Sequence, residues 1–279
     1  MTVSITILGS TGMLGTAVST YFLNNTEYTV YTSYRDISKK INDNSFHFDS
    51  AFSNFEDIPK SDYIINCIGV IKPLMSSDRF NSIYSNSIFP HLLSESCNET
   101  FTKLIHITTD CVYSGTTGPY NESSHHDCLD EYGKSKSLGE PTDSMVLRTS
   151  IIGEEVYNKV SLIEWAKSMK DGEVNGYTNH YWNGVTTKEY AEACHNIIKK
   201  NLYEQGLFHV FSPKPVSKFE LLQIINNKFE LNMKISNFAT QDACNRTLST
   251  NKNLNNKLNI RSIEDQIKRI VIGENNETF

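Results

Sequence analysis

A glycine-rich string near the start of the chain constrains the fold more than any other feature of the sequence. It reads Gly9-Ser10-Thr11-Gly12-Met13-Leu14-Gly15 and directly follows an apolar run at residues 4–8. Glycine at these spacings permits a tight strand-to-helix turn, lets backbone N–H groups approach a pyrophosphate, and lets the helix pack closely on a sheet. A tight turn that binds nothing would use the same glycines. Its place at the first strand–helix junction favours a dinucleotide site formed by Gly9, Thr11, Gly12, Met13, Leu14 and Gly15.

The first half of the chain alternates short apolar runs, rich in β-branched residues, with amphipathic stretches. This alternation predicts strands at residues 4–8, 28–33, 45–48, 63–68, 104–108 and 145–149, and helices at 13–22, 81–97 and 131–139. Near-continuous apolar strands separated by helices indicate a parallel sheet with both faces covered. We therefore expect an α/β fold, a Rossmann doubly wound parallel sheet, over residues 1–150.

After residue 149 the pattern loosens. Helices are expected at 162–169, 187–199 and 218–229, with a short strand at 206–210. These elements predict a smaller α/β C-terminal lobe, formed mainly by residues 151–279. No linker composition separates it from the first domain, so we expect the chain to cross between the two.

Charge and composition exclude several classes of partner. A formal net charge of −6 and a pI near 5.8 argue against nucleic acid, because phosphate neutralisation needs a basic surface. No apolar run is long enough to span a bilayer and no secretion signal is recognisable, so we expect no membrane partner and a cytoplasmic location. The six scattered cysteines are then expected to be reduced thiols. The oligomeric state stays open, with a homodimer as one option.

The end of the second expected strand bears on the choice between NAD and NADP. An acid at this strand tip would accept from the ribose 2′-hydroxyl and repel a 2′-phosphate. The strand tip lacks an acid and supplies the hydroxyl of Ser33 and the guanidinium of Arg35. This favours NADPH. Two points argue against it: the acidic Asp36 lies next to Arg35, and Arg35 could simply be a solvated surface charge. Asp49, after the third strand, is placed either to meet the adenine amino group or to act as a cap.

Tyr132 and Lys136 lie four residues apart, one turn from each other on the same face of an expected helix. A nearby ammonium can lower the phenol pKa and anchor a cofactor ribose, and the phenol can protonate a carbonyl as hydride arrives. Upstream, a strand ends in Thr108-Thr109-Asp110, at the edge where open α/β sheets bind ligands. We expect Thr109 to hydrogen-bond the substrate oxygen, and His106 inside the strand to be a core residue.

Three segments together resemble the extended short-chain dehydrogenases, most closely the dTDP-4-dehydrorhamnose reductase-like sugar-nucleotide reductases. They are the glycine string, residues 108–115 (TTDCVYSG) and residues 132–140 (YGKSKSLGE). The likeness continues at residues 147–153, 162–165 and 176–187 and near Arg246.

The resemblance covers nearly the whole chain. It implies an NADP-binding domain, a sugar-nucleotide-binding lobe, and Thr109, Tyr132 and Lys136 as the reductase triad. The implied reaction is NADPH-dependent reduction of the 4-keto group of a nucleotide-linked 4-keto-6-deoxyhexose, a UDP or dTDP sugar with or without a 2-acetamido group.

Cys111 departs from this resemblance, because the rhamnose reductases usually carry an aromatic residue there. GDP-fucose synthases, which are bifunctional epimerase-reductases, place a cysteine at this point as the epimerisation base. In an extended segment Cys111 and Thr109 would point the same way. Cys111 is therefore either a base for C3 epimerisation or a small packing residue under the nicotinamide. Its partner acid would be Lys159 or His180, and we favour Lys159.

Lys72, Trp182 and Arg246 complete the expected substrate site. Lys72 follows the end of a strand and could equally be a solvated charge. Trp182 lies in an aromatic, polar loop and could equally pack inside the lobe. The run His125-His126-Asp127-Cys128 has the composition of a metal site, but adjacent histidines in a loop seldom converge on one ion. No metal is expected.

Two other functions compete with the reductase. Some relatives of the family bind the dinucleotide and regulate a partner enzyme after losing the triad, whereas this chain keeps all three residues. A UDP-sugar 4-epimerase or dehydratase is the other alternative. Dehydratases usually carry an Asp-Glu pair where this chain has Asp110-Cys111.

Overall fold

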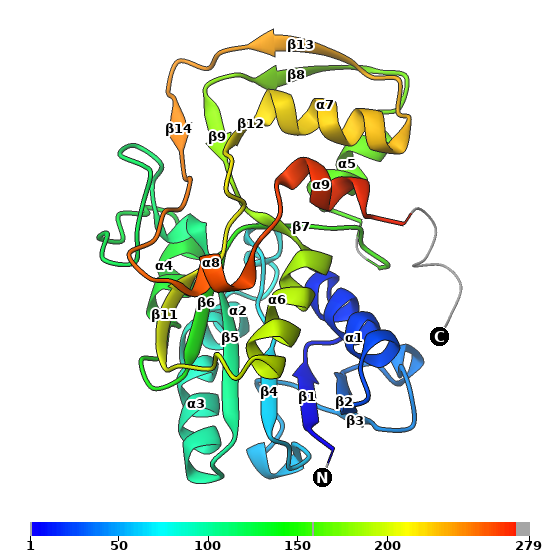
Figure 1. Cartoon of the computed structure of the whole chain (residues 1–279), viewed down its shortest axis with the longest axis vertical. Coiled ribbons are helices and arrows are strands. Elements are labelled where there is room, and N and C mark those ends of the chain that lie inside the picture. Colours follow the sequence, from blue (N-terminus) through cyan, green and yellow to red (C-terminus); the bar gives the residue numbers. More distant parts are fainter. Residues whose placement is uncertain (1, 158, 272–279) are drawn as a thin grey trace.

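The computed structural model describes residues 2–157 and 159–271, and a seven-stranded parallel sheet forms its centre (Figure 1). The strand order is β11-β6-β5-β4-β1-β2-β3. The bounds are β1 Ser4–Leu8, β2 Thr29–Tyr34, β3 Ser45–His47, β4 Tyr63–Asn66, β5 Lys103–Thr109, β6 Met145–Thr149 and β11 Gly206–His209. The order runs outward in both directions from β1, which makes the space between β1 and β4 the switch point of a Rossmann fold. The predicted fold class is therefore confirmed.

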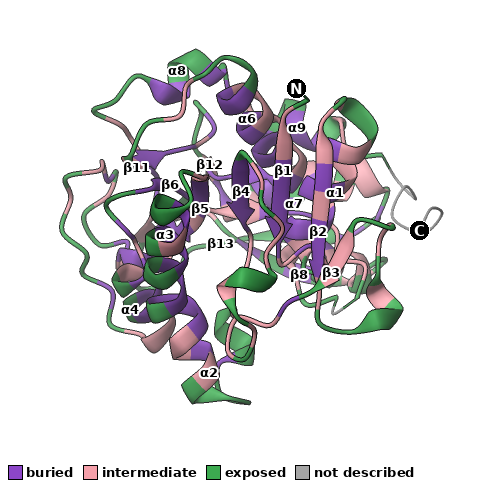
Figure 2. Ribbon diagram, turned by 90° about the horizontal axis from the view of Figure 1, so that it is seen from below, coloured by how far each residue is buried: buried purple, intermediate pink, exposed green. Residues whose placement is uncertain are grey.

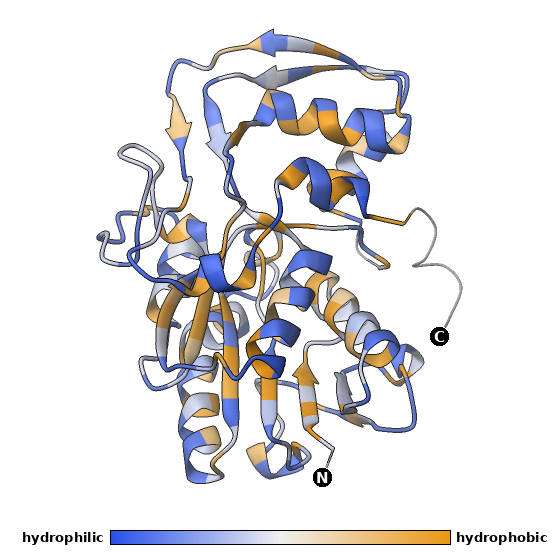
Figure 3. Cartoon of the chain, in the orientation of Figure 1, coloured by the Kyte–Doolittle hydropathy of each residue, from blue (hydrophilic) through white to orange (hydrophobic). Residues whose placement is uncertain are grey.

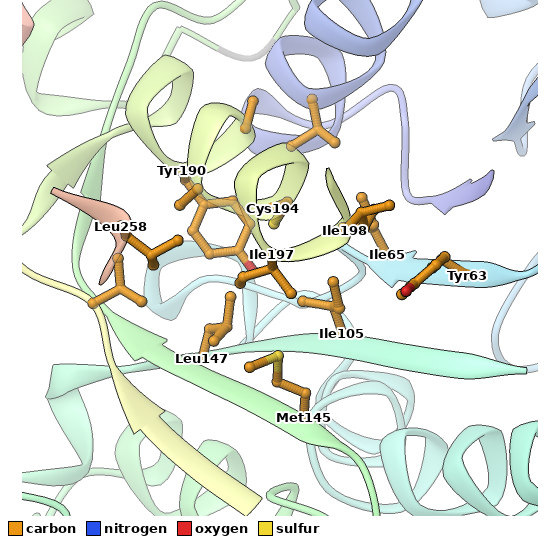
Figure 4. Close-up of a cluster of buried hydrophobic side chains, with 14 of the residues drawn as sticks. Tyr63, Ile65, Ile105, Met145, Leu147, Tyr190, Cys194, Ile197, Ile198 and Leu258 are labelled. Atoms are coloured by element: carbon orange, nitrogen blue, oxygen red, sulfur yellow. The ribbon is translucent and has the colours of Figure 1, made fainter. Parts of the chain in front are cut away.

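Helices cover both faces of this sheet, so its central strands β1, β4, β5 and β6 are rich in apolar residues (Figure 3). On one face α1 (Met13–Asn25) and α6 (Thr187–Lys199) pack against each other. Figure 4 shows how Tyr190, Cys194 and Ile197 of α6 cover Ile105 of β5 and Leu147 of β6. The opposite face carries α3 (Phe89–Glu99) and α4 (Glu131–Leu138), and the central strands are buried between the two layers (Figure 2).

A smaller lobe lies beyond the carboxyl edge of the sheet, at the top of Figure 1. Its helices are α5 (Leu162–Ser168), α7 (Lys218–Phe229) and α9 (Ile263–Lys268). Its strands are β8 Glu173–Tyr177 with β13 Lys234–Phe238, β9 His180–Trp182 with β12 Val216–Ser217 and β14 Cys244–Asn245, and β7 Ile151–Ile152 with β10 Val185–Thr186. A separate apolar cluster, which includes Ile163, Trp182 and Leu221, forms its core.

The chain crosses between the two cores after residue 150. Helix α6 and the short helix α8 (Leu254–Leu258) contribute to the core of the Rossmann domain, and β11 adds a strand beside β6. A boundary at residue 150 therefore leaves out segments that complete the first domain, because an apolar strand is most stable where it extends the existing sheet.

The helix expected at residues 81–97 is interrupted. The structure has α2 (Arg79–Ile83), a π-helical turn at Tyr84–Ile88, and then α3. Pro90 has no N–H to donate to the carbonyl of Asn86, and the Asn86 side chain is held by Val70, accepting from its N–H (2.8 Å) and donating to its carbonyl (2.9 Å). The Asn86 carbonyl instead faces Gly139, where a Cβ would lie 1.8 Å away.

No described helix combines the length and the hydropathy needed to span a bilayer.

Candidate active site

The glycine string forms a backbone cradle at the switch point of the sheet. Gly9 has a φ of +74°, and a Cβ on Gly15 would lie 2.0 Å from the Gly9 carbonyl oxygen, so neither position accepts another residue. Gly12 is the N-cap of α1 and brings no side-chain cap. The first N–H groups of this 13-residue helix therefore face the cradle without an internal acceptor, which suits a pyrophosphate.

Ser33, at the end of β2, braces this cradle. It is 3% exposed, its hydroxyl accepts from the Gly9 N–H at 2.8 Å, and its carbonyl accepts from the Ser10 hydroxyl. Arg35 has a side chain that is 76% exposed, with Nη1 3.9 Å from Oδ2 of Asp49. The other carboxylate oxygen of Asp49 accepts from the Ala51 N–H at 2.9 Å. Asp49 therefore caps a turn and pairs with Arg35, while Ser33 is directed at the loop.

Tyr132 and Lys136 are held at the same edge by α4. Asp130 caps this helix by accepting from the Gly133 N–H at 3.0 Å, and the buried Lys136 donates from Nζ to the Ile107 carbonyl at 3.1 Å. Burial lowers the pKa of Lys136 to about 8, and Glu140 opposes the change. Asn86, which the sequence did not single out, lies beside this lysine: a Cβ on Gly69 would be 3.5 Å from its Oδ1 and 3.7 Å from Lys136 Nζ.

The phenol of Tyr132 is protonated at neutral pH. Burial raises its pKa most, Cys111 raises it further, and a hydrogen bond with the Thr109 side chain lowers it. Lys136 is not among the largest influences on the pKa of Tyr132, and its ammonium donates to the Ile107 carbonyl. A protonated phenol within hydrogen-bonding reach of Thr109 is the form that a proton donor needs.

Cys111 does not lie on an extended segment. Residues Asp110–Val112 form a 3-10 turn, and the Thr109 hydroxyl caps it by accepting from the Cys111 N–H at 3.1 Å. The reasoning from alternating side chains was therefore wrong, although the thiol still reaches the site. Its Sγ accepts from Arg246 Nη1 at 3.8 Å. Burial raises the pKa of Cys111 to about 12 and Asp110 adds to this, against a smaller lowering by Arg246.

Two further charged groups reach the site, and the sequence carried no signal for either role. Asp110 is 4% exposed, and burial raises the pKa of its carboxyl. Lys218, the first residue of α7, holds its Nζ 5.0 Å from the centre of the Trp182 ring. Burial lowers the pKa of Lys218, and the charges that oppose this are first Asp110 and then Cys111. Lobe and Rossmann domain thus meet around one carboxylate and the two cations Lys218 and Arg246.

The remaining predicted substrate residues are spread more widely. Lys72 pairs with the α4 cap, with Nζ 3.4 Å from Asp130 Oδ2. Trp182 is 4% exposed and belongs to the lobe core, and its ring lies against the Lys218 ammonium. Lys159 is exposed with a φ of +53° and makes no hydrogen bond or ion pair to a described residue. His180 pairs with Thr240 inside the lobe, at 2.8 Å.

No group of three His, Cys, Asp or Glu side chains within residues 2–157 and 159–271 is arranged to hold a metal ion. His126 instead accepts from the buried Arg148 at 2.6 Å. His106 lies inside β5 at 0% exposure, hydrogen-bonded to Asn66 at 3.0 Å.

The glycine cradle and the Tyr132–Lys136 helix at one edge of a Rossmann sheet define an extended short-chain dehydrogenase. Within that class the chain belongs to the RmlD substrate binding domain family, whose model matches residues 3–270. The resemblance expected from the sequence is thereby confirmed.

The known proteins that are similar to this chain carry names that describe different functions. The spore coat polysaccharide biosynthesis protein SpsK of Bacillus subtilis (strain 168) is 28% identical over 213 residues, which is 73% of this chain and 66% of SpsK. The methionine adenosyltransferase 2 subunit beta of Danio rerio is 24% identical over 241 residues, 81% of this chain and 74% of the subunit. A solved dTDP-4-dehydrorhamnose reductase of Bacillus anthracis str. Ames, in complex with NADP, matches with a TM-score of 0.75 and 21% identity, over 96% of this chain and 98% of that one. At this identity the structural match establishes the fold.

Proposed function

We propose that this protein is an NADPH-dependent reductase of the 4-keto group of a nucleotide-linked 4-keto-6-deoxyhexose. The observation that carries the proposal is the convergence of Thr109, a protonated Tyr132 and Lys136 beside a glycine cradle. Membership of the RmlD substrate binding domain family supports it.

The chain's own groups account for the proton half of this reduction. NADPH, when bound, supplies the hydride that reaches the carbonyl carbon. The Thr109 hydroxyl orients the carbonyl oxygen, and Tyr132 gives its phenolic proton to that oxygen as negative charge develops. Lys136, one turn away and held at the Ile107 carbonyl, would anchor the cofactor ribose, and solvent restores the proton of Tyr132. The product is the alcohol, and the glycine cradle would hold the pyrophosphate of the cofactor.

Support for a negatively charged substrate comes from the two cations of the lobe. Lys218 and Arg246 lie on the lobe side of the site, near the buried Asp110, and the ammonium of Lys218 forms no direct ion pair within the described part of the chain. A partly buried cation of this kind is stabilised by an anionic ligand. A nucleotide sugar with its diphosphate meets this requirement, and UDP and dTDP both remain candidates as the carrier. Lys72, in the turn that follows β4 and beside the α4 cap Asp130, would contact the same ligand.

The preference for NADPH over NADH rests on Arg35. Its exposed guanidinium lies at the end of β2 and is tied only loosely to Asp49, at 3.9 Å. It can therefore turn to a 2′-phosphate. Ser33 fixes the Gly9 N–H, and its hydroxyl retains a proton that it can donate to the same phosphate.

A regulatory function without catalysis is the second candidate, favoured by the similarity to a methionine adenosyltransferase 2 subunit beta. The complete triad favours the reductase. C3 epimerisation by Cys111 is the finer extension of the proposal: the thiol lies at the site, but it would have to lose its proton from a pKa of about 12.

The test is incubation with NADPH and a panel of UDP-, dTDP- and GDP-linked 4-keto-6-deoxy sugars, with products identified by NMR. We expect NADPH oxidation coupled to formation of a C4 alcohol with at least one member. Tight NADPH binding without oxidation across the whole panel would instead favour the regulatory function.

A further inference from the structure

Arg148, on β6, is the largest fully buried side chain of the molecule's described part, and every N–H of its guanidinium has an acceptor. Nε and Nη2 donate to the two oxygens of Glu140, at 3.1 and 2.5 Å. Nη2 also donates to His126 Nε2 at 2.6 Å, and Nη1 donates to the Tyr113 hydroxyl at 2.5 Å and to His209 Nε2 at 3.0 Å. A single guanidinium thus joins five segments of chain.

This arrangement fixes the protonation of both histidines. Arginine stays charged and can only donate, so Nε2 of His126 and Nε2 of His209 must both be acceptors. Each imidazole is therefore neutral with its proton on Nδ1. From there His126 donates to Ser137 Oγ at 2.5 Å, and His209 donates to the Ser249 carbonyl at 2.7 Å.

The His126 bond reaches the catalytic helix. Ser137 follows Lys136 directly in α4, and His126 lies in the long loop between the Cys111 turn and Asp130, the cap of the same helix. His126 was singled out in the sequence only for its metal-like neighbours, and the reductase chemistry proposed above does not use it.

We propose that His126 is a positioning residue of the reductase: in its neutral form it ties the α4 helix, which carries Tyr132 and Lys136, to the buried Arg148. Protonation of His126 would place an N–H against the guanidinium and break the tie. The inference rests on the proposed function, because the helix is catalytic only if the reduction takes place.

The charges around His126 decide where it titrates. Arg148 faces it from β6, Glu140 lies 3.8 Å from Nε2 just after α4, and Asp127 is its neighbour in the loop. Burial lowers the pKa of His126 most and Arg148 lowers it further, while Glu140 and Asp127 raise it. Burial likewise lowers the pKa of His209, to about 4, with Arg148 adding to the effect and Glu122 opposing it.

The sign of the pH effect follows. Between the folded and the unfolded pKa values the unfolded chain binds more protons than the folded one, so stability rises with pH. For both histidines the contribution of the neutral form is complete above about pH 6.5 and is lost as the pH falls through the lowered pKa, which for His209 is about 4.

The experiment compares wild type, His126→Gln, Ser137→Ala and the control His125→Gln. The control changes the neighbouring exposed histidine, which makes no side-chain hydrogen bond to a described residue. Glutamine at position 126 can still accept from Arg148 but does not titrate and loses the Nδ1 donor. We expect kcat to fall about three- to tenfold in His126→Gln and Ser137→Ala, the loss expected for one hydrogen bond, with KM little changed. As the pH is lowered, kcat should fall less steeply in His126→Gln than in wild type. The control His125→Gln should match wild type.

NMR of the imidazole nitrogens gives a readout that does not depend on turnover. We expect His126 to carry its proton on Nδ1 at pH 7.5, and the acid loss of thermal stability to shrink in His126→Gln but not in His125→Gln. A proton on Nε2, or a His126→Gln enzyme with the wild-type kcat and pH profile, would overturn the inference. If no keto sugar is reduced by the wild type, the proposed function fails and the positioning role fails with it. The NMR spectrum and the unfolding profiles still decide the histidine state in that case.

Discussion

Replacing Lys136 by methionine should make the protein more stable and inactive. Lys136 is 5% exposed, and burial lowers the pKa of its ammonium from 10.5 to about 8. Holding this charge inside the fold at pH 7 therefore destabilises the protein by about 3 kcal/mol. Methionine has a similar length and carries no charge, so it removes this cost. It also leaves the Ile107 carbonyl without the Lys136 donor, at a loss of roughly 1–2 kcal/mol.

The net expectation is a gain of about 1–2 kcal/mol, which for a chain of this size raises the melting temperature by roughly 2–8 °C. The pH dependence supplies a second check. Between pH 8 and 10.5 the unfolded chain holds more protons at Lys136 than the folded one, so wild-type stability gains from rising pH in this window. In Lys136→Met that contribution is absent, and the difference between the two proteins should shrink as the pH rises.

The assay is calorimetry of wild type, Lys136→Met and the control Lys134→Met, which changes an exposed lysine of the same helix. NADPH turnover with the substrate found in the panel is measured alongside, and should be lost only in Lys136→Met. A Lys136→Met protein that is less stable than wild type at pH 7 would refute the reasoning that burial of this charge is unfavourable.

Four further substitutions test the remaining assignments. Tyr132→Phe should lower kcat by about 10²-fold or more, because the proton donor is lost, with NADPH affinity nearly unchanged by titration calorimetry. Arg35→Ala should remove most of the preference for NADPH over NADH, a charge-assisted contact of roughly 1.5–3 kcal/mol; equal affinities in the wild type would refute the assignment. Lys218→Met should raise KM for the nucleotide sugar about tenfold or more, since it removes a contact to charge, and an unchanged KM would exclude Lys218 from the substrate site. Mass spectrometry of the product made in D₂O tests Cys111: solvent deuterium at carbon, lost in Cys111→Ser, would establish epimerisation, and its absence in the wild type would limit the protein to reduction.

Local sequence patterns predicted most of the fold. Helices at residues 187–199 and 218–229 and the strand at 145–149 have the bounds that were expected. Their apolar residues repeat at the spacing of one element type, and Ser217 and Thr186 each begin a helix as a side-chain cap. The interruption of the helix at residues 79–99 was missed. Pro90 is a local signal for it, whereas the hydrogen bonds between Val70 and the Asn86 side chain join residues distant in the sequence.

In the candidate site, too, local patterns were predictable and contacts between distant residues were not. The glycine cradle and the Tyr132–Lys136 spacing are short-range patterns, and the structure brings them to one edge of the sheet. Ser33 shows the limit of this reasoning. Its position at the strand tip predicted a contact to a 2′-phosphate, and only the structure shows that its hydroxyl also accepts from the Gly9 N–H. Which way a hydroxyl turns depends on the loop packed against it, and no spacing records that.

The roles of charged side chains that the fold wholly or partly buries were the hardest to predict from the sequence. Lysine and arginine are ordinarily surface residues, so Lys218 and Arg148 carried no signal, and only the packed structure shows Arg148 fully buried and Lys218 partly buried. The two then differ in how their charge is compensated. Every donor of Arg148 has an acceptor, and Glu140 is its counter-ion. Its role is therefore to hold segments of the fold together. Lys218 faces Asp110 without a direct ion pair to a described residue. A charge that the fold leaves incompletely compensated marks a place where a ligand can complete the structure. The anionic part of the substrate should therefore bind at Lys218, on the lobe side of the site, and not at the Arg148 network.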